Sequence, residues 1–148
     1  MSEDIIAALK ENVIQGRQNQ DDEGIEEDMV GTPGVLELTH AALEKNIPLE
    51  DIITNGLTAG MQVVGEKFAT KEYYIPDMLA SAQAVGAAMD VLKPHLEKSN
   101  VETKGKFAIV TVKGDIHDIG KNIVSILLKG AGYAVSYTHL TLPTILLV

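Results

Sequence analysis

The residues with the clearest capacity for chemistry lie in the segment 114–124, which reads Gly-Asp-Ile-His-Asp-Ile-Gly-Lys-Asn-Ile-Val. His117 follows Asp115 by two positions and precedes Gly120 by three. A neutral imidazole is a common metal ligand, and a nearby carboxylate can fix which ring nitrogen carries the proton. The segment is therefore a candidate metal site. The alternative is that these polar residues only cap the helix that follows.

The sequence around this segment predicts a strand, a loop and a helix. An apolar run, 107–112, precedes the segment, and an apolar-periodic stretch, 123–128, follows it. Because the run is apolar on both faces of a strand, it favours a parallel sheet covered by helices. Residues 133–137 predict a second strand. Ligands bind at the carboxyl ends of strands in open α/β sheets, which is where His117 would lie.

The first 97 residues predict four amphipathic helices with short connections, which is typical of a helical bundle. Capping preferences place the four helix starts at Ser2, Thr32-Pro33, Pro48 and Pro76-Asp77. The second helix is expected to end at Asn46 and the third at about Ala69. The polar stretch 16–24 and the acidic run 21–28 are interpreted as a solvated loop.

Two linked patterns resemble one known family. Asp-x-His-x-x-Gly at 115–120, after a strand, resembles the signature of corrinoid proteins that serve methylamine and methanol methyltransferases. It is also similar to the cobalamin module of methionine synthase. Residues 56–68, followed by 74–78, look like the helical cap of these corrinoid proteins. The two patterns occur in the family's order, which makes the pair more specific than either pattern alone.

The resemblance implies a fold and a set of site residues. The fold is a four-helix cap bundle followed by the start of a Rossmann-like, flavodoxin-like cobalamin-binding domain. In the family the histidine is the lower axial ligand of cobalt, which falls here on His117, and the aspartate that hydrogen-bonds it falls on Asp115. Gly120 belongs to the same cofactor-binding motif. The cap covers the upper face of the corrin, and Phe68 and Tyr74 are the candidates to face it.

A simpler interpretation exists for the cap residues. Apolar and aromatic side chains at helical spacing usually form the core of a bundle. This alternative applies to Phe68 and Tyr74 and equally to Met61, Val64 and Met78. The remaining histidines, at positions 40, 95 and 139, share no spacing with a second ligand and are interpreted as structural or surface residues.

The resemblance also predicts a domain organisation. Residues 1–97 are the cap, 98–106 a polar linker, and 107–148 the amino-terminal fragment of the α/β domain. The family pattern extends to about Val135, and residues 136–148 are not family-like. A single strand–helix–strand unit leaves strand edges and one apolar sheet face uncovered. We therefore expect self-association through the uncovered sheet. We also expect weak or undetectable cobalamin binding by this chain, because the resemblance implies a slot for the cofactor's nucleotide tail that these residues do not supply.

The function implied by the resemblance is methyl-group carriage. A substrate-specific methyltransferase would pass a methyl group to the cobalt of cobalamin on this protein, and an acceptor methyltransferase would remove it. The protein would then be a carrier subunit rather than a complete enzyme. Two alternatives remain open: a cobalamin-binding sensor module, and an inactive fragment whose helical half folds alone.

The composition excludes several other classes of protein. The net charge of −9 argues against nucleic acid or an anionic membrane as a partner, because both attract lysine and arginine. The absence of cysteine excludes disulfides, thiolate nucleophiles and cysteine-based zinc sites. The acidic amino terminus is unlike a signal peptide, and no apolar run is as long as a membrane span. We therefore expect a cytoplasmic protein without a membrane partner.

Overall fold

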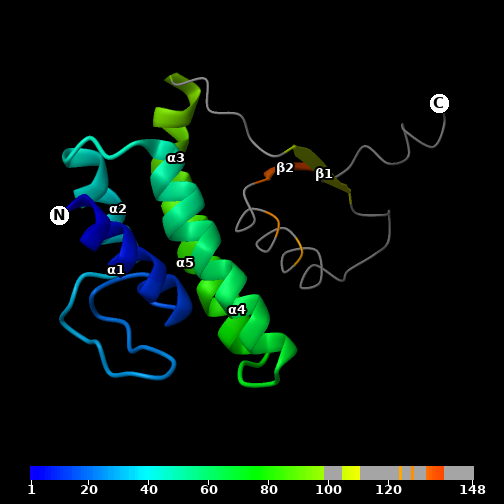
Figure 1. Cartoon of the computed structure of the whole chain (residues 1–148). Coiled ribbons are helices and arrows are strands. Elements are labelled where there is room, and N and C mark those ends of the chain that lie inside the picture. Colours follow the sequence, from blue (N-terminus) through cyan, green and yellow to red (C-terminus); the bar gives the residue numbers. More distant parts are fainter. Residues whose placement is uncertain (99–104, 111–123, 125–127, 129–132, 139–148) are drawn as a thin grey trace.

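The computed structural model describes residues 1–98, 105–110, 124, 128 and 133–138. These form a bundle of helices and a pair of strands, shown in Figure 1. In chain order the elements are α1 Ser2–Ile14, α2 Val35–Glu44, α3 Leu49–Asp51, the π-helical segment η1 Ile52–Thr58, α4 Ala59–Ala69, α5 Ile75–Lys98, β1 Lys106–Val110 and β2 Ala134–Thr138.

The first helix starts one residue earlier than predicted. Ser2 lies inside α1, and Met1 occupies the N-cap position without a side-chain hydrogen bond, so the prediction that Ser2 caps this helix is wrong. The amino group of Met1 lies 3.2 Å from a carboxylate oxygen of Asp4. Acidic residues in a first turn, here Glu3 and Asp4, also favour helix formation through the helix dipole.

The second helix starts later than predicted, because Thr32 has another role. Its hydroxyl donates to the carbonyl of Met29 at 2.7 Å and accepts from Arg17 at 2.9 Å, so it does not cap a helix. Gly34 takes the N-cap position instead, and the Glu37 carboxylate accepts a hydrogen bond from its amide at 2.9 Å. A Cβ at Gly34 would lie 2.7 Å from the backbone of Asn19, which explains the glycine.

The third helix runs from Leu49 to Ala69, as predicted after Pro48, but it contains the π-helical segment η1. This long helix packs very closely against α1. A Cβ at Gly56 would lie 2.7 Å from the Leu9 side chain, and one at Gly60 would lie 2.7 Å from Val13. The two glycines therefore allow the helix backbone to approach α1 at these points.

The fourth helix, α5, begins at Ile75, one residue before the predicted start. The Asp77 carboxylate accepts a hydrogen bond from the Tyr74 amide at 2.8 Å and so satisfies a free donor at this helix end. Pro94 lies within the helix, which continues to Lys98. Lys98, the first residue of the predicted linker, is therefore still helical.

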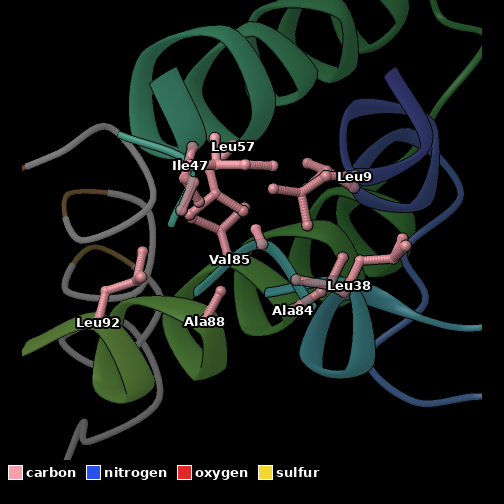
Figure 2. Packing of buried hydrophobic residues seen from close by; sticks show 12 residues of the cluster. Leu9, Leu38, Ile47, Leu57, Ala84, Val85, Ala88 and Leu92 are labelled. Carbon is pink, nitrogen blue, oxygen red and sulfur yellow. The ribbon is translucent and has the colours of Figure 1, made fainter. Parts of the chain in front are cut away.

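The hydrophobic core lies between α1, α2, the η1 segment and α5, and Figure 2 shows its packing. Leu9, Val85 and Leu92 are completely buried in it. The apolar face of α5 is lined partly by alanines, which bring the neighbouring helices close. The labelled members of this cluster are Leu9, Leu38, Ile47, Leu57, Ala84, Val85, Ala88 and Leu92. The predicted helical bundle is thus confirmed.

The two predicted strands are present and parallel. β1 pairs with β2 in a register that places Lys106 opposite Ala134 and Val110 opposite Thr138. The Phe107 ring meets the Tyr133 ring edge to face, with centroids 4.9 Å apart. Phe107 remains 42% exposed and Val110 36% exposed, so these apolar side chains of β1 are incompletely covered. β2 also includes residues 136–138, the first positions of the segment predicted above not to be family-like.

The part of the chain described here contains no helix long and apolar enough to cross a membrane.

Candidate functional site

The predicted site residues fall into two groups. Asp115, His117 and Gly120 lie outside the described residues, so their roles stay predictions. Phe68 and Tyr74 are described, and they flank the turn between α4 and α5. Among the described residues no group of three or more histidines and carboxylates could hold a metal ion. The site that the structure presents is therefore the α4–α5 turn, residues 70–74, drawn in green in Figure 1.

The α4–α5 turn is closed by backbone hydrogen bonds to the last turn of α4. The carbonyl of Lys67 accepts from the amides of Glu72 at 2.9 Å and Tyr73 at 3.0 Å. The Phe68 carbonyl accepts from the amide of Lys71, which adopts the left-handed conformation with a φ of 65°. These bonds satisfy carbonyls that a helix end otherwise leaves free. They also fix the direction in which the turn residues point.

Tyr73 anchors the turn to the bundle. Its side chain is buried, and its hydroxyl donates to the carbonyl of Ile14, the last residue of α1, at 2.8 Å. The ring packs in a small second core with Ile14 and Val64. Burial, together with the negative charge of Glu26, raises the pKa of Tyr73 to about 12. The neutral phenol is therefore the stable form at ordinary pH.

Phe68 and Tyr74 are both exposed at the surface of the bundle. Phe68 is 40% exposed and Tyr74 is 66% exposed. The residues before them differ, because Lys67 lies over the Tyr73 ring and Tyr73 is hydrogen-bonded to Ile14. The alternative that these two aromatics form the bundle core is therefore wrong. That alternative holds for Val64, which is completely buried, and Met61 is partly buried against the same core.

Sequence reasoning missed Ile75 as a third member of this surface. Ile75 is the first residue of α5 and is 55% exposed, beside Tyr74 in sequence. The sequence did carry a signal for it. Ile75 falls in the connection predicted between the third and fourth helices, where an apolar side chain has no helix face through which to reach the core. We call Phe68, Tyr74 and Ile75 the turn patch. These three residues flank one turn of the chain, and exposed apolar side chains that form a patch mark a binding surface more often than isolated ones do.

Comparison with known proteins supports the predicted relationship. A family model described as a B12 binding domain matches residues 32–93, which include the whole α4–α5 turn. Monomethylamine corrinoid protein 2 of Methanosarcina acetivorans is 42% identical over 104 residues, covering 69% of this chain and 48% of that protein. Methionine synthase of Mycobacterium tuberculosis is 38% identical over 128 residues, covering 86% of this chain and 10% of that protein.

Solved structures of known proteins support the same relationship. The structure of the methanol:cobalamin methyltransferase complex MtaBC from Methanosarcina barkeri matches with a TM-score of 0.72 and 27% identity, covering 98% of this chain and 51% of that chain. The chain is thus related to the corrinoid proteins of methylamine and methanol methyltransferase systems, and its residues 32–93 match the B12 binding domain family. The predicted fold class, a four-helix cap followed by the start of a Rossmann-like domain, is confirmed. The chain spans about half the length of the curated corrinoid proteins it matches.

Two glycines of the helical bundle leave open space around them. A Cβ at Gly65 or at Gly86 would meet no atom within 4 Å, in contrast to Gly56 and Gly60. Gly65 lies three residues before Phe68 on α4, so the two share a helix face. The absence of a side chain beside an exposed aromatic leaves room for a flat ligand to approach the backbone.

An open groove of about 660 Å³ lies elsewhere on the bundle, and it contains none of the predicted corrinoid-site residues. It is formed by the first turns of α1, the connection between α2 and α3, and the start of the long helix. The residues lining it are Ser2, Glu3, Ile6, Ala7, Lys45, Asn46, Ile47, Pro48, Asp51 and Asn55.

Proposed function

We propose that this chain is part of a corrinoid methyl carrier, in which the helical cap covers one face of the corrin. The observation that carries the proposal is the turn patch, which lies on a domain matching the B12 binding family. Neither hydrophobic cluster of the bundle includes any of these three side chains. The corrin is a large flat ring whose edge and face are partly apolar, and it suits such a patch together with the open space at Gly65.

The chain's own residues would divide the work between two faces of the cofactor. Phe68 and Tyr74, with Ile75, would exclude water from the upper face. His117 would hold the metal from below through one imidazole nitrogen, and Asp115 would accept a hydrogen bond from the other nitrogen. Gly120 would let the following helix approach the strand closely. Cobalamin, when bound, would supply the cobalt that carries the methyl group.

The partners in this proposal are two methyltransferases, one specific for the methyl donor and one for the acceptor. A related solved structure is itself a methanol:cobalamin methyltransferase complex, which supports a donor enzyme as one partner. The named relatives include monomethylamine and trimethylamine corrinoid proteins, which favours a carrier over a sensor module. We also propose the domain division predicted above, with residues 1–97 as the cap and residues after 106 as the start of the α/β domain.

The test uses this chain joined after Val135 to the carboxyl-terminal half of the Methanosarcina acetivorans relative. The hybrid should bind hydroxocobalamin with a histidine-ligated absorption spectrum. His117→Ala should change that spectrum to the water-ligated form, and Phe68→Ala should lower the affinity without changing the ligation.

The matched controls are His40→Ala and His95→Ala, because both of these histidines are exposed on the cap. Neither control should alter the spectrum. An unchanged spectrum in the His117→Ala hybrid would disprove the ligand assignment. Failure of the unsubstituted hybrid to bind hydroxocobalamin would disprove the proposed function.

A further inference from the structure

Glu26 makes a long-range contact with the end of α4. It lies in the loop that follows α1, and its Oε1 accepts a hydrogen bond from Lys67 Nζ at 2.7 Å, across 41 positions of sequence. The Lys67 ammonium also lies 3.6 Å from the Glu72 carboxylate and 5.1 Å from the centre of the Tyr73 ring. One lysine therefore joins the loop, the end of α4 and the turn.

The other side of Glu26 is held by Gln15, which is itself buried at the end of α1. The side-chain oxygen Oε1 of Gln15 accepts from the Glu26 amide at 2.8 Å, and its Nε2 donates to Glu26 Oε2 at 3.4 Å. Gln15 thus holds both the backbone and the carboxylate of Glu26 independently of Lys67. The ion pair with Lys67 therefore loses less side-chain entropy on forming than a typical surface pair does.

The groups fixed by this contact adjoin the turn patch directly. Lys67 precedes Phe68, and its carbonyl accepts two of the amides that close the turn. Tyr73, the ring beneath the Lys67 ammonium, precedes Tyr74. We infer that Glu26 is a positioning residue for the corrin: through Lys67 it holds the α4–α5 turn in the conformation that presents Phe68 and Tyr74. This inference rests on the proposed function.

The charges around Glu26 agree with this role. The hydrogen bond from Lys67 lowers the pKa of Glu26, against an opposing effect of burial, and the same contact raises the pKa of Lys67. The other charged groups that act on this cluster are Glu72, Asp77 and Glu11, all of them acidic. Of these groups Glu72 acts on Lys67, whereas Asp77 and Glu11 act on Tyr73. Lys67 pairs with two carboxylates, those of Glu26 and Glu72.

The first test is amide hydrogen exchange on the full chain without cobalamin. Glu26→Gln keeps the shape of the side chain and removes its charge. Exchange at the Glu72 and Tyr73 amides, corrected for intrinsic rates, should become about two- to fivefold faster, since exposed ion pairs have effects of this order. Amides of the buried core at Val85 should not change. Glu27→Gln is the matched control, because its exposed carboxyl is adjacent to Glu26.

The pair itself is tested by combining substitutions. In a Lys67→Met background, Glu26→Gln should have no further effect on exchange, because the partner is already absent. In the unsubstituted chain, acidification through the lowered pKa of Glu26 should reduce the protection of the same two amides, measured as exchange relative to the intrinsic rate at each pH. Glu26→Gln should remove the part of that loss that Glu26 causes. Unchanged exchange at both amides in Glu26→Gln would overturn the inference, whatever the function of the protein.

The link to the cofactor is tested in the hybrid chain used above. Glu26→Gln should weaken hydroxocobalamin binding about two- to fivefold, in proportion to the loosened turn, and leave the histidine-ligated spectrum intact. Faster exchange with unchanged affinity would overturn the positioning role. No binding by the unsubstituted hybrid would instead refute the proposed function, and the exchange result would then show only that Glu26 orders the turn.

Discussion

At the scale of single residues, glycines in the same long helix have opposite explanations. Gly56 and Gly60 are required because α1 packs against them, and an added Cβ would lie 2.7 Å from Leu9 or Val13. Gly65 meets no neighbour, so the fold does not explain why a helix interior carries this unfavourable residue. The proposed corrin contact supplies a reason at that position.

This contrast gives a paired prediction. Gly60→Ala should lower the free energy of unfolding by about 1–3 kcal/mol, because the new methyl group overpacks the contact with α1. Gly65→Ala should raise it by about 0.5–1 kcal/mol through better helix propensity. Urea unfolding followed by circular dichroism measures both. In the hybrid chain Gly65→Ala should also weaken hydroxocobalamin binding. Stabilisation without any loss of affinity would remove Gly65 from the proposed site.

Tyr73 gives a pH prediction at the same scale. Its pKa in the folded chain is raised to about 12, whereas an unfolded tyrosine ionises near 10. Between these values the unfolded chain has lost the proton that the folded chain retains, so stability should fall as the pH rises from about 10 to about 12. Tyr73→Phe should remove that part of the alkaline loss and should cost about 0.5–1.5 kcal/mol at pH 8, through the bond to Ile14. Urea unfolding of the unsubstituted chain and of Tyr73→Phe, at pH 8 and between pH 10 and 12, tests this. The same dependence of unfolding free energy on alkaline pH in both proteins would contradict it.

At the scale of elements, the loop between α1 and α2 is more organised than the solvated loop predicted from its composition. Arg17 is completely buried within it. Its guanidinium donates to Asn12 Oδ1 at 2.6 Å, to the hydroxyl and carbonyl of Thr32, and to the carbonyls of Gln20 and Asp22. The Asp22 carboxylate accepts from the Gln18 amide at 2.9 Å. The loop is therefore partly structural, because backbone carbonyls of Gln20, Asp22 and Thr32 accept hydrogen bonds from one buried cation.

The loop prediction follows from these bonds. Arg17→Met should lower the free energy of unfolding by more than about 3 kcal/mol, because several buried acceptors lose a charged donor together. Arg17→Lys should recover only part of this, since an ammonium cannot reproduce the planar fork of donors. Lys45→Met, at an exposed position, is the control. Chemical unfolding measures all three variants, and an Arg17→Met protein as stable as the control would show that the loop does not depend on this side chain.

At the scale of the whole molecule, the cap contains its own core. The bundle buries its apolar residues between its own helices, whereas Phe107 and Val110 of β1 stay partly exposed. Residues 1–98 are a continuous described segment that includes every bundle helix. This arrangement is typical of a unit that folds without the strands.

We therefore expect residues 1–98 alone to be helical and to unfold cooperatively. Thermal unfolding followed by circular dichroism should give a single transition. The full chain should associate more strongly than this cap fragment in size-exclusion chromatography, because β1 exposes apolar side chains at a strand edge. A broad, non-cooperative transition of the cap fragment would mean that the bundle needs the rest of the chain.

The sequence by itself determined the features that depend on local pattern. Apolar spacing predicted the helices and both strands, because burial of one face imposes a period on nearby residues. The motif at 115–120 and the cap pattern predicted the corrinoid-protein family. Helix starts were less certain, since Thr32 resembles a cap by type but bonds to Arg17, fifteen positions away.

Only the tertiary structure decided which apolar residues face outward and what holds them there. Phe68 and Val64 are both apolar and four positions apart on α4, yet one is exposed and the other completely buried. The contact between Glu26 and Lys67 joins positions 41 apart, and the sequence around either residue does not indicate its partner. Such contacts depend on how the helices pack, which the sequence of any one element does not specify.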